Sequence, residues 1–400
     1  MTEGLKDKVA IVGMGCSHFG ERWGTGVDDL IQEAVSEACR DAGITIGDIQ
    51  AAWLGTVMGS QMGGGPPSGL LLSQVLQTSI PVTRVENLCA TGQEAVRGAV
   101  YGVAAKAYDI VLAIGVEKIK DSGYGGLGAQ YPGKWDPVYA YGGTSPARYA
   151  MAATAYFDKH HLSPEQGKRL LAEISVKSHY YGARNPRAHL KKEVTVEQVM
   201  AAPMVAWPLG LFDCCGVTDG AAAAILVPAD QAKRYRDDYV TIKGMGLVAT
   251  PGWGKEMDDF DLTTWDATEA AANQAYREAG IKNPRNELDL VELHDCFSIA
   301  ELLASEHLSL CERGQYQKEF TESRAYYHDG EMPVNISGGL KSFGHPVGAS
   351  GCREAYEIYK QLQGKAEPSR QVRNARLGLS HNQGGHPGRF VCGVIIYGLP

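Results

Sequence analysis

The chain lacks the features that mark membrane, secreted or nucleic-acid-binding proteins. Its 400 residues contain no apolar run near the roughly 20 residues that a membrane span needs. The N-terminus lacks the basic-then-apolar layout of a signal peptide. No dense basic run is present and the net charge is −8, which argues against nucleic acid as a partner. We therefore expect a cytoplasmic protein without membrane or nucleic-acid contacts.

The cysteines also lack the spacing of a disulfide framework or a zinc ribbon. There are nine, an odd number, and no two of them form a Cys-x-x-Cys pair. The pair His160 and His161 and the pair His381 and His386 have no further ligands at metal-like spacing. We expect no bound metal, so each cysteine is either a core residue or a reactive group.

Apolar residues and glycine are plentiful. Hydrophobic residues make up 44% of the chain, and 49 residues are glycine. This composition supports a large core with many tight turns, and the length exceeds what one hydrophobic core usually supports. The chain should therefore form two domains of similar size.

The sequence contains an internal repeat. Residues 9–15 (VAIVGMG) resemble residues 240–246 (VTIKGMG), and both indicate a strand that ends in a glycine turn. Residues 38–44 and 275–281 indicate helix ends with glycine C-caps. Two further pairs follow in the same order, namely the strands at 49–55 and 288–293 and the helix-opening turns at 89–95 and 348–355. Each half therefore indicates an α/β pattern with helices on a mixed sheet.

One long segment of the first half has no counterpart in the second. It begins with a Gly- and Tyr-rich stretch and continues with helical patterns around 146–158 and 164–182. Such insertions form lids, binding loops or oligomer contacts. We therefore expect a first half at 1–117, an inserted loop domain at 118–215, the end of the first half at 216–235 and a second half at 236–400.

Three segments place chemically active side chains at turns. Cys89 precedes a buried helix, whose dipole is expected to lower the pKa of the thiol. His294 and Cys296 follow the predicted strand 288–293, at a strand end where α/β sheets gather ligands. His345 lies in a glycine-rich loop before the repeat partner of the Cys89 helix, so pseudo-symmetry should bring it close to Cys89.

A core role is the alternative for each of these side chains taken alone. Free cysteine is among the most buried residue types, and His294 would also fit as a hydrogen-bonded core histidine. Residues 380–388 (SHNQGGHPG) indicate a turn in which the backbone N–H groups of Gly384 and Gly385 suit an oxyanion hole. An ordinary hairpin explains the same segment equally well.

Taken together, the motifs resemble those of the thiolases, specifically the sterol-carrier-protein-2-type branch, over essentially the whole chain. They are NLCATG at 87–92, LFDCC at 211–215, DGAAA at 219–223, HDCF at 294–297 and GLKSFGHPVGA at 339–349. The resemblance implies a duplicated thiolase fold, with two pseudo-symmetric βαβ halves in five α-β-α-β-α layers and an inserted loop domain. It also implies coenzyme A as a substrate, no tightly bound cofactor, and a homodimer or homotetramer. Some relatives act with a small OB-fold, zinc-ribbon partner, so such a partner subunit is a further expectation.

The same resemblance implies a role for each reactive residue. Cys89 would take the acyl group, and His345 would activate its thiol. Cys296 would move the α-proton of the substrate, in place of the C-terminal cysteine that most thiolases carry; His381 is the competing proton carrier. His294 and His345 would polarise the thioester oxygen, and backbone N–H groups of Cys89 and of Gly384 and Gly385 would hold the tetrahedral oxyanion.

The expected activity is cleavage of a 3-oxoacyl-CoA by CoA, or the reverse Claisen condensation, through an acyl group on Cys89. A retro-aldol lyase acting on an acyl-CoA and a non-catalytic acyl-CoA-binding subunit are the alternatives. The second would be expected to have lost at least one reactive residue, and none is lost. Neither the acyl chain nor the physiological direction follows from the sequence.

Basic and aromatic residues suggest where substrates bind. Arg184 and Arg187, with Lys191 and Lys192, form a basic cluster that would dock the anionic CoA, although a solvated helix face explains it equally well. Lys341 and Ser342 are expected beside the substrate. A bulky or aromatic acyl chain, such as an aryl-succinyl group, would suit the aromatic residues of the insertion, which are Tyr124, Tyr131, Trp135, Tyr139 and Tyr141.

Overall fold

The computed structural model describes residues 4–57, 68–122, 144–250 and 261–400. The aromatic residues that the sequence suggested for the acyl pocket, from Tyr124 to Tyr141, lie outside these ranges.

Strands from both halves form one mixed sheet in the order β3-β2-β4-β7-β1-β8-β11-β10-β9. The first half contributes β1 (Val9–Cys16), β2 (Ala51–Gly55), β3 (Val82–Val85), β4 (Val111–Glu117) and β7 (Gly220–Pro228). The second half contributes β8 (Val240–Ala249), β9 (Leu290–Leu293), β10 (Leu377–His386) and β11 (Arg389–Gly398). A separate hairpin consists of β5 (Met204–Ala206) and β6 (Leu209–Gly210).

The strand order is symmetric about the contact between β1 and β8. β1 pairs antiparallel with β7, and β8 does the same with β11. β4 then pairs parallel with β2, as β10 does with β9. The outermost position is repeated as well. In the first half β3 pairs parallel with β2, and in the second half Val334 makes a parallel bridge to Val291 of β9. The structure therefore confirms the internal repeat.

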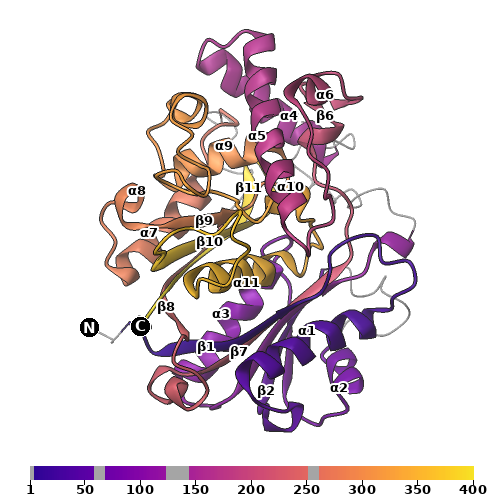
Figure 1. Ribbon diagram of the computed structural model, residues 1–400, viewed down its shortest axis with the longest axis vertical. Coiled ribbons are helices and arrows are strands. Elements are labelled where there is room, and N and C mark those ends of the chain that lie inside the picture. Colours follow the sequence, from indigo (N-terminus) through magenta and orange to yellow (C-terminus); the bar gives the residue numbers. More distant parts are fainter. Residues whose placement is uncertain (1–3, 58–67, 123–143, 251–260) are drawn as a thin grey trace.

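Four helices complete the layers. α3 (Thr91–Ala104) and α11 (Ser350–Leu362) contact each other and strands of both halves, so they form the central layer (Figure 1). α1 (Val27–Ala42) covers the outer face of β1 and β7, and α7 (Asp266–Ala279) covers β8 and β11. The predicted α-β-α-β-α arrangement is confirmed, with the sheets of the two halves joined edge to edge at β1 and β8.

The repeated glycines lie inside strands and do not turn the chain. Both β1 and β8 continue through their Gly-Met-Gly sequences, so the expected glycine turns are wrong. A Cβ atom at Gly15 would lie 2.0 Å from the carbonyl oxygen of Ala34 in α1, and one at Gly246 would lie 2.0 Å from that of Ala271 in α7. Glycine is needed at these positions because the covering helix touches the strand backbone.

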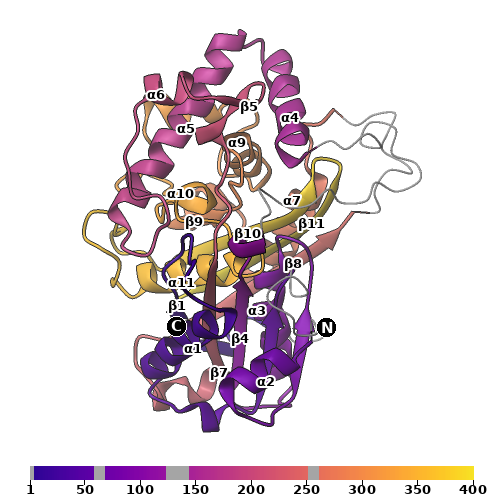
Figure 2. The ribbon, with the colours of Figure 1, turned by 90° about the vertical axis from the view of Figure 1, so that its right-hand side faces the viewer.

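Helices of the insertion lie over the second half. α4 (Ser145–Lys159) and α5 (Pro164–Arg184) confirm the two predicted helical segments, and α6 (Val196–Met200) follows them. Both longer helices contact α9 (Ser298–His307), and α5 also contacts α10 (Gly339–Ser342), as Figure 2 shows. The short helices α2 (Leu70–Leu76) and α8 (Pro284–Glu287) lie elsewhere, and no helix within the described ranges is long and apolar enough to cross a membrane.

Candidate active site

The central layer brings a cysteine of the first half next to two histidines of the second. Cys89 lies in the turn before α3, His345 in the loop before α11, and His294 directly after β9. The Cys89 sulfur and one ring nitrogen of each histidine all lie within 4.8 Å of one another. All three side chains are buried, and the histidine rings are nearly perpendicular, with centroids 5.1 Å apart. Three of the four reactive residues expected from the sequence therefore meet.

The hydrogen bond at Nδ1 of His345 determines the protonation of the other ring nitrogen, Nε2. The Ser350 hydroxyl donates to the carbonyl oxygen of Pro346 at 3.0 Å, so at 2.7 Å it accepts from Nδ1–H of His345. That tautomer leaves an unprotonated Nε2, which is buried and has no hydrogen-bond partner among the described residues. His345 is therefore oriented to accept a proton.

Burial controls the protonation of Cys89 and His345. It raises the pKa of the Cys89 thiol to about 12, helped by the negative charges of Glu117 and Glu86. It lowers the pKa of His345 to about 3 and also lowers that of His294. The expected lowering of the Cys89 pKa by the helix dipole is therefore wrong, because loss of hydration is the larger effect. At rest the pair consists of a neutral thiol and a neutral imidazole.

Gly384 and Gly385 contact the Cys89 turn from a strand. The sequence allowed a turn or an ordinary hairpin here, and the hairpin is correct: β10 continues to His386 and pairs antiparallel with β11, so both glycines lie in a strand and not in the turn. The backbone N–H of Gly385, whose φ is +101°, donates to the Cys89 sulfur. A Cβ atom at Gly384 would lie 2.5 Å from the carbonyl oxygen of Asn87. Because Gly384 has no side chain, β10 can approach the Cys89 turn closely enough for the Gly385 N–H to reach the sulfur.

Cys296 is buried near Cys89, beside two groups that the sequence did not single out. Its thiol interacts electrostatically with that of Cys89, and burial raises its pKa. Cys215 lies opposite it, because the Cys215 N–H donates to the Cys296 carbonyl oxygen at 2.9 Å beside an antiparallel bridge. The Tyr149 hydroxyl of α4 lies close enough to the Cys296 sulfur to favour its charged form as a hydrogen-bond donor. Cys215 was visible in the LFDCC motif, whereas Tyr149 looks like any apolar position of a buried helix face.

His381 supports the HDCF turn from behind. Its Nδ1 accepts the backbone N–H of His294 at 3.4 Å, and its side chain is fully buried in β10. Burial lowers its pKa to about 3. His381 therefore contacts the backbone of the turn, whereas the Cys296 thiol lies within electrostatic range of that of Cys89.

Lys341 and Ser342, which the sequence placed beside the substrate, make hydrogen bonds to backbone carbonyl groups of the protein. The Lys341 ammonium donates to the carbonyl oxygen of Phe212, and the Ser342 hydroxyl donates to that of Leu190 at 2.8 Å, with both side chains almost fully buried. These contacts favour structural roles for Lys341 and Ser342.

The two arginines also have protein partners. Arg187 pairs with Glu37 at 2.8 Å. Arg184 pairs with Glu193 at 2.8 Å and stacks over Tyr180, with 27% of its side chain exposed. The Arg187 side chain is exposed to a similar extent, 23%, so the two arginines are about equally accessible.

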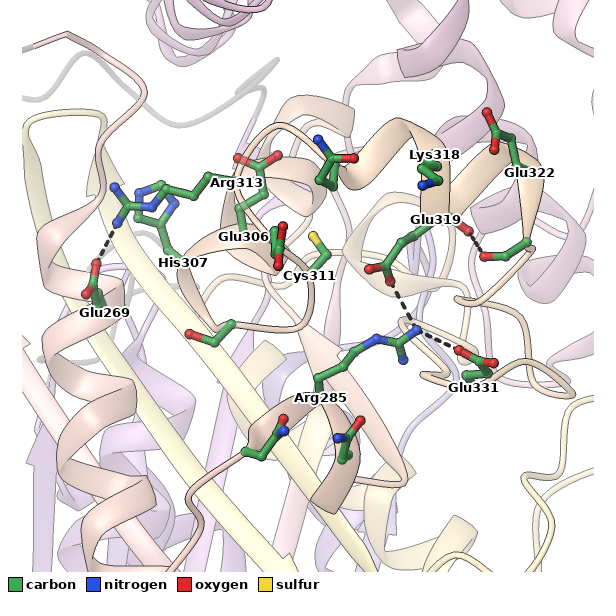
Figure 3. A pocket seen from close by; sticks show the side chains of 16 residues that line it. Glu269, Arg285, Glu306, His307, Cys311, Arg313, Lys318, Glu319, Glu322 and Glu331 are labelled. Carbon is green, nitrogen blue, oxygen red and sulfur yellow. Dashed lines mark hydrogen bonds and ion pairs between the residues drawn. The ribbon is translucent and has the colours of Figure 1, made fainter.

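A separate polar cavity of about 900 Å³ lies between α7, α8 and the end of α9 (Figure 3). Its arginines are already paired, Arg313 with Glu269 at 2.6 Å, and Arg285 with Glu319 and Glu331 at 3.1 Å each. None of the reactive residues lines it.

A duplicated α/β fold in which a buried cysteine and imidazole meet between the halves defines the thiolase class of proteins, and comparison with known families agrees. The thiolase N-terminal domain matches residues 9–230, and the thiolase C-terminal domain-like family matches residues 253–394. The chain therefore belongs to the thiolase family.

Relatives place the chain near the expected branch. It is 40% identical to an acetyl-CoA acetyltransferase of Methanothermobacter thermautotrophicus, over 95% of this chain and 97% of the relative. Human sterol carrier protein 2 is 31% identical over 94% of this chain and 70% of its own length. A solved structure titled "Ltp2-ChsH2(DUF35) aldolase" shares the fold, with a TM-score of 0.82 and 21% identity over 99% of this chain and 98% of that one. The resemblance to the sterol-carrier-protein-2-type thiolases is confirmed.

Proposed function

We propose that the protein transfers acyl groups between CoA thioesters, cleaving a 3-oxoacyl-CoA with CoA or running the reverse Claisen condensation through an acyl group on Cys89. The observation that carries this proposal is the Cys89 thiol, with the free Nε2 of His345 close by and the Gly385 N–H on its sulfur. The acetyl-CoA acetyltransferases among the relatives support CoA thioesters as substrates. No tightly bound cofactor or metal is part of the proposal.

In the first step, the Cys89 sulfur attacks the keto carbon while its proton passes to Nε2 of His345. The developing oxyanion is held by backbone N–H groups of Cys89 and of the Gly384 and Gly385 segment. Donors placed in this way typically contribute about 3–4 kcal/mol each. Because both partners start neutral, charge appears only as the bond forms.

In the second step, the Cα–Cβ bond breaks and its electron pair becomes an enolate. His294 and His345 stabilise the enolate oxygen, and Cys296 supplies the proton to carbon. A second CoA thiol then attacks the acyl group on Cys89 and gives its proton to the Cys296 thiolate. The shortened acyl-CoA leaves, and Cys89 takes back its proton from His345. The condensation direction uses the same steps in reverse.

Intact-mass spectrometry after addition of an acyl-CoA tests the assignment. We expect one acyl adduct on the wild-type chain and none on Cys89→Ala, which should also lose cleavage activity. Cys39→Ala, a buried cysteine of α1, serves as the matched control and should acylate normally. An adduct that persists in Cys89→Ala would contradict the proposal.

The same variant separates the alternatives. A retro-aldol lyase on this fold would keep cleaving its substrate without the Cys89 thiol, and a non-catalytic subunit would show no turnover before or after the substitution. A panel of short, long, branched and aromatic 3-oxoacyl-CoAs, with mass-spectrometric readout, would then identify the acyl chain, including the proposed bulky or aromatic group.

Two proposals concern binding and assembly. Arg184 and Arg187 remain accessible, whereas Lys341 and Ser342 are buried, so Arg184→Glu should raise the KM for CoA. We also propose a homodimer or homotetramer, with a small OB-fold, zinc-ribbon subunit as partner; the two-component title of the structural relative supports a partner of some kind. Light scattering gives the mass, and full activity of the purified chain alone would contradict a required partner.

A further inference from the structure

We propose that Tyr149, from the inserted helix α4, is a positioning residue that holds the Cys296 sulfur ready for proton transfer at the α-carbon of the substrate. This inference rests on the proposed function, in which Cys296 carries that proton. It gives the inserted segment a direct part in the chemistry of the second half.

The Tyr149 ring is fixed on several sides. Only 1% of the residue is exposed. Its ring lies against Phe297, with centroids 4.6 Å apart, and is nearly perpendicular to the Trp265 ring, with centroids 6.1 Å apart. Phe297 directly follows Cys296, so the same packing positions the tyrosine and the backbone beside the thiol. The hydroxyl therefore has little freedom to leave the sulfur.

A chain of hydrogen bonds determines the direction in which the hydroxyl donates. Thr268 of α7 donates to Oε1 of Gln383 at 3.4 Å, which orients the amide. Nε2 of Gln383 in β10 then donates to the Tyr149 oxygen at 3.2 Å. Because the tyrosine oxygen already accepts a hydrogen bond from Gln383, its own O–H is left to donate to Cys296. Each donor in this series of hydrogen bonds is therefore oriented toward the Cys296 sulfur.

Cys296 needs such a donor because its surroundings disfavour a thiolate. Burial raises its pKa, and the thiols of Cys215 and Cys89 and the carboxyl of Asp295 add to the effect. Tyr149 acts in the opposite sense, through a hydrogen bond to the charged sulfur. Burial also raises the pKa of Tyr149 well above its usual value, so the tyrosine keeps its proton and remains a donor.

The step balances without another reagent. In the condensation direction the Cys296 thiolate takes a proton from the α-carbon, an S–H bond forms, the C–H bond breaks and its electron pair becomes the enolate. In cleavage the S–H bond breaks and the proton returns to carbon. Tyr149 loses and gains no proton in either direction; its hydrogen bond strengthens when the sulfur is charged.

Tyr149→Phe tests the inference, because it removes the hydroxyl and keeps the ring. We expect exchange of the acetyl-CoA methyl protons with solvent deuterium, and carbon–carbon bond cleavage, to fall about 10- to 100-fold, the effect of losing one hydrogen bond to a charged group. Acylation of Cys89 by acetyl-CoA should stay within about twofold of wild type. The pH at which exchange reaches half its maximum should rise, because the thiolate has lost a donor.

Tyr156→Phe is the matched control. Tyr156 lies on the same helix, is equally buried, and donates to Glu306 at 2.8 Å, away from Cys296. We expect it to leave the ratio of proton exchange to acylation unchanged. Gln383→Leu, which breaks the chain one step earlier, should lower that ratio to a smaller extent.

The outcomes separate this inference from the proposed function. If wild-type protein takes no acyl group on Cys89, the proposed function fails. If acylation is normal but Tyr149→Phe exchanges protons at the wild-type rate, only the role of Tyr149 is overturned. An equal loss of exchange in Tyr156→Phe would also overturn it, because the effect would then be a general loosening of α4.

Discussion

Cys89 and His345 face each other as uncharged groups, because burial disfavours both the thiolate and the imidazolium. A catalytic cysteine that forms an ion pair with histidine is a thiolate at rest. Here the proton moves only when the substrate carbonyl accepts the sulfur, so the site is selective for electrophiles that bind within it.

Alkylation by iodoacetamide should show this difference. With a pKa of about 12, the thiolate fraction of Cys89 grows about tenfold for each pH unit, so alkylation should rise steadily between about pH 6 and pH 9 without a plateau. The measurement is the modified fraction of the Cys89 peptide over time. An inflection below pH 7 would indicate a resting ion pair and contradict the neutral one.

Individual site residues were predictable only where chemistry and symmetry coincided. Cys89 and His345 open equivalent helices of the two halves, so the repeat itself predicted that they meet. Tyr149 belongs to no repeat, because its helix is part of the insertion, and its contact with Cys296 depends on how α4 packs on α9. The direction of the Cys89 pKa shift could not be predicted from the sequence either, since it depends on complete burial of the thiol.

At the scale of secondary structure, the Gly-Met-Gly repeats show how closely helix and sheet approach. The sequence correctly identified two equivalent strands but assigned their glycines to turns. A glycine in a strand and one in a turn look alike in sequence; the difference is the neighbouring helix backbone, 2.0 Å from a Cβ atom placed at Gly15. For the same reason, the sequence left both a turn and a hairpin open for the glycines at 384 and 385.

Gly15→Ala should therefore destabilise the protein. The added methyl group collides with the Ala34 carbonyl, and overpacking of this kind costs about 1–3 kcal/mol. We expect the thermal midpoint, followed by circular dichroism, to fall by several degrees. Gly24→Ala is the control, since a Cβ atom there would meet no atom within 4 Å, and it should change stability by less than about 0.5 kcal/mol. Equal midpoints for the two variants would contradict the close-contact explanation.

On the scale of the whole molecule, one carboxylate links the halves at the site. Glu117, at the end of β4, accepts from the Thr56 hydroxyl and the Val57 N–H of the first half, both at 3.0 Å. It also accepts from the Gly348 N–H of the second half at 2.8 Å, in the loop that carries His345. The same negative charge raises the pKa of the Cys89 thiol. Glu117 therefore aligns the base with the nucleophile while making the free thiol less acidic.

Removing the Glu117 carboxylate should therefore change two properties in opposite directions: the alkylation rate of Cys89 should rise and the rate of acyl transfer should fall. In Glu117→Ala the N–H groups of Val57 and Gly348, which both bond to the same carboxylate oxygen, lose their acceptor, so the His345 loop loses part of its anchor, and acyl transfer should fall about tenfold or more. Alkylation of Cys89 at fixed pH should instead become faster, because the carboxylate no longer opposes the thiolate. Glu86→Gln is the control: Glu86 also raises the pKa of Cys89, but its carboxylate accepts from the Leu88 N–H, and a glutamine oxygen can still do so. It should speed alkylation slightly and leave acyl transfer nearly unchanged. If Glu117→Ala keeps full acyl transfer, the halves are aligned by packing of α3 on α11 and not by this carboxylate.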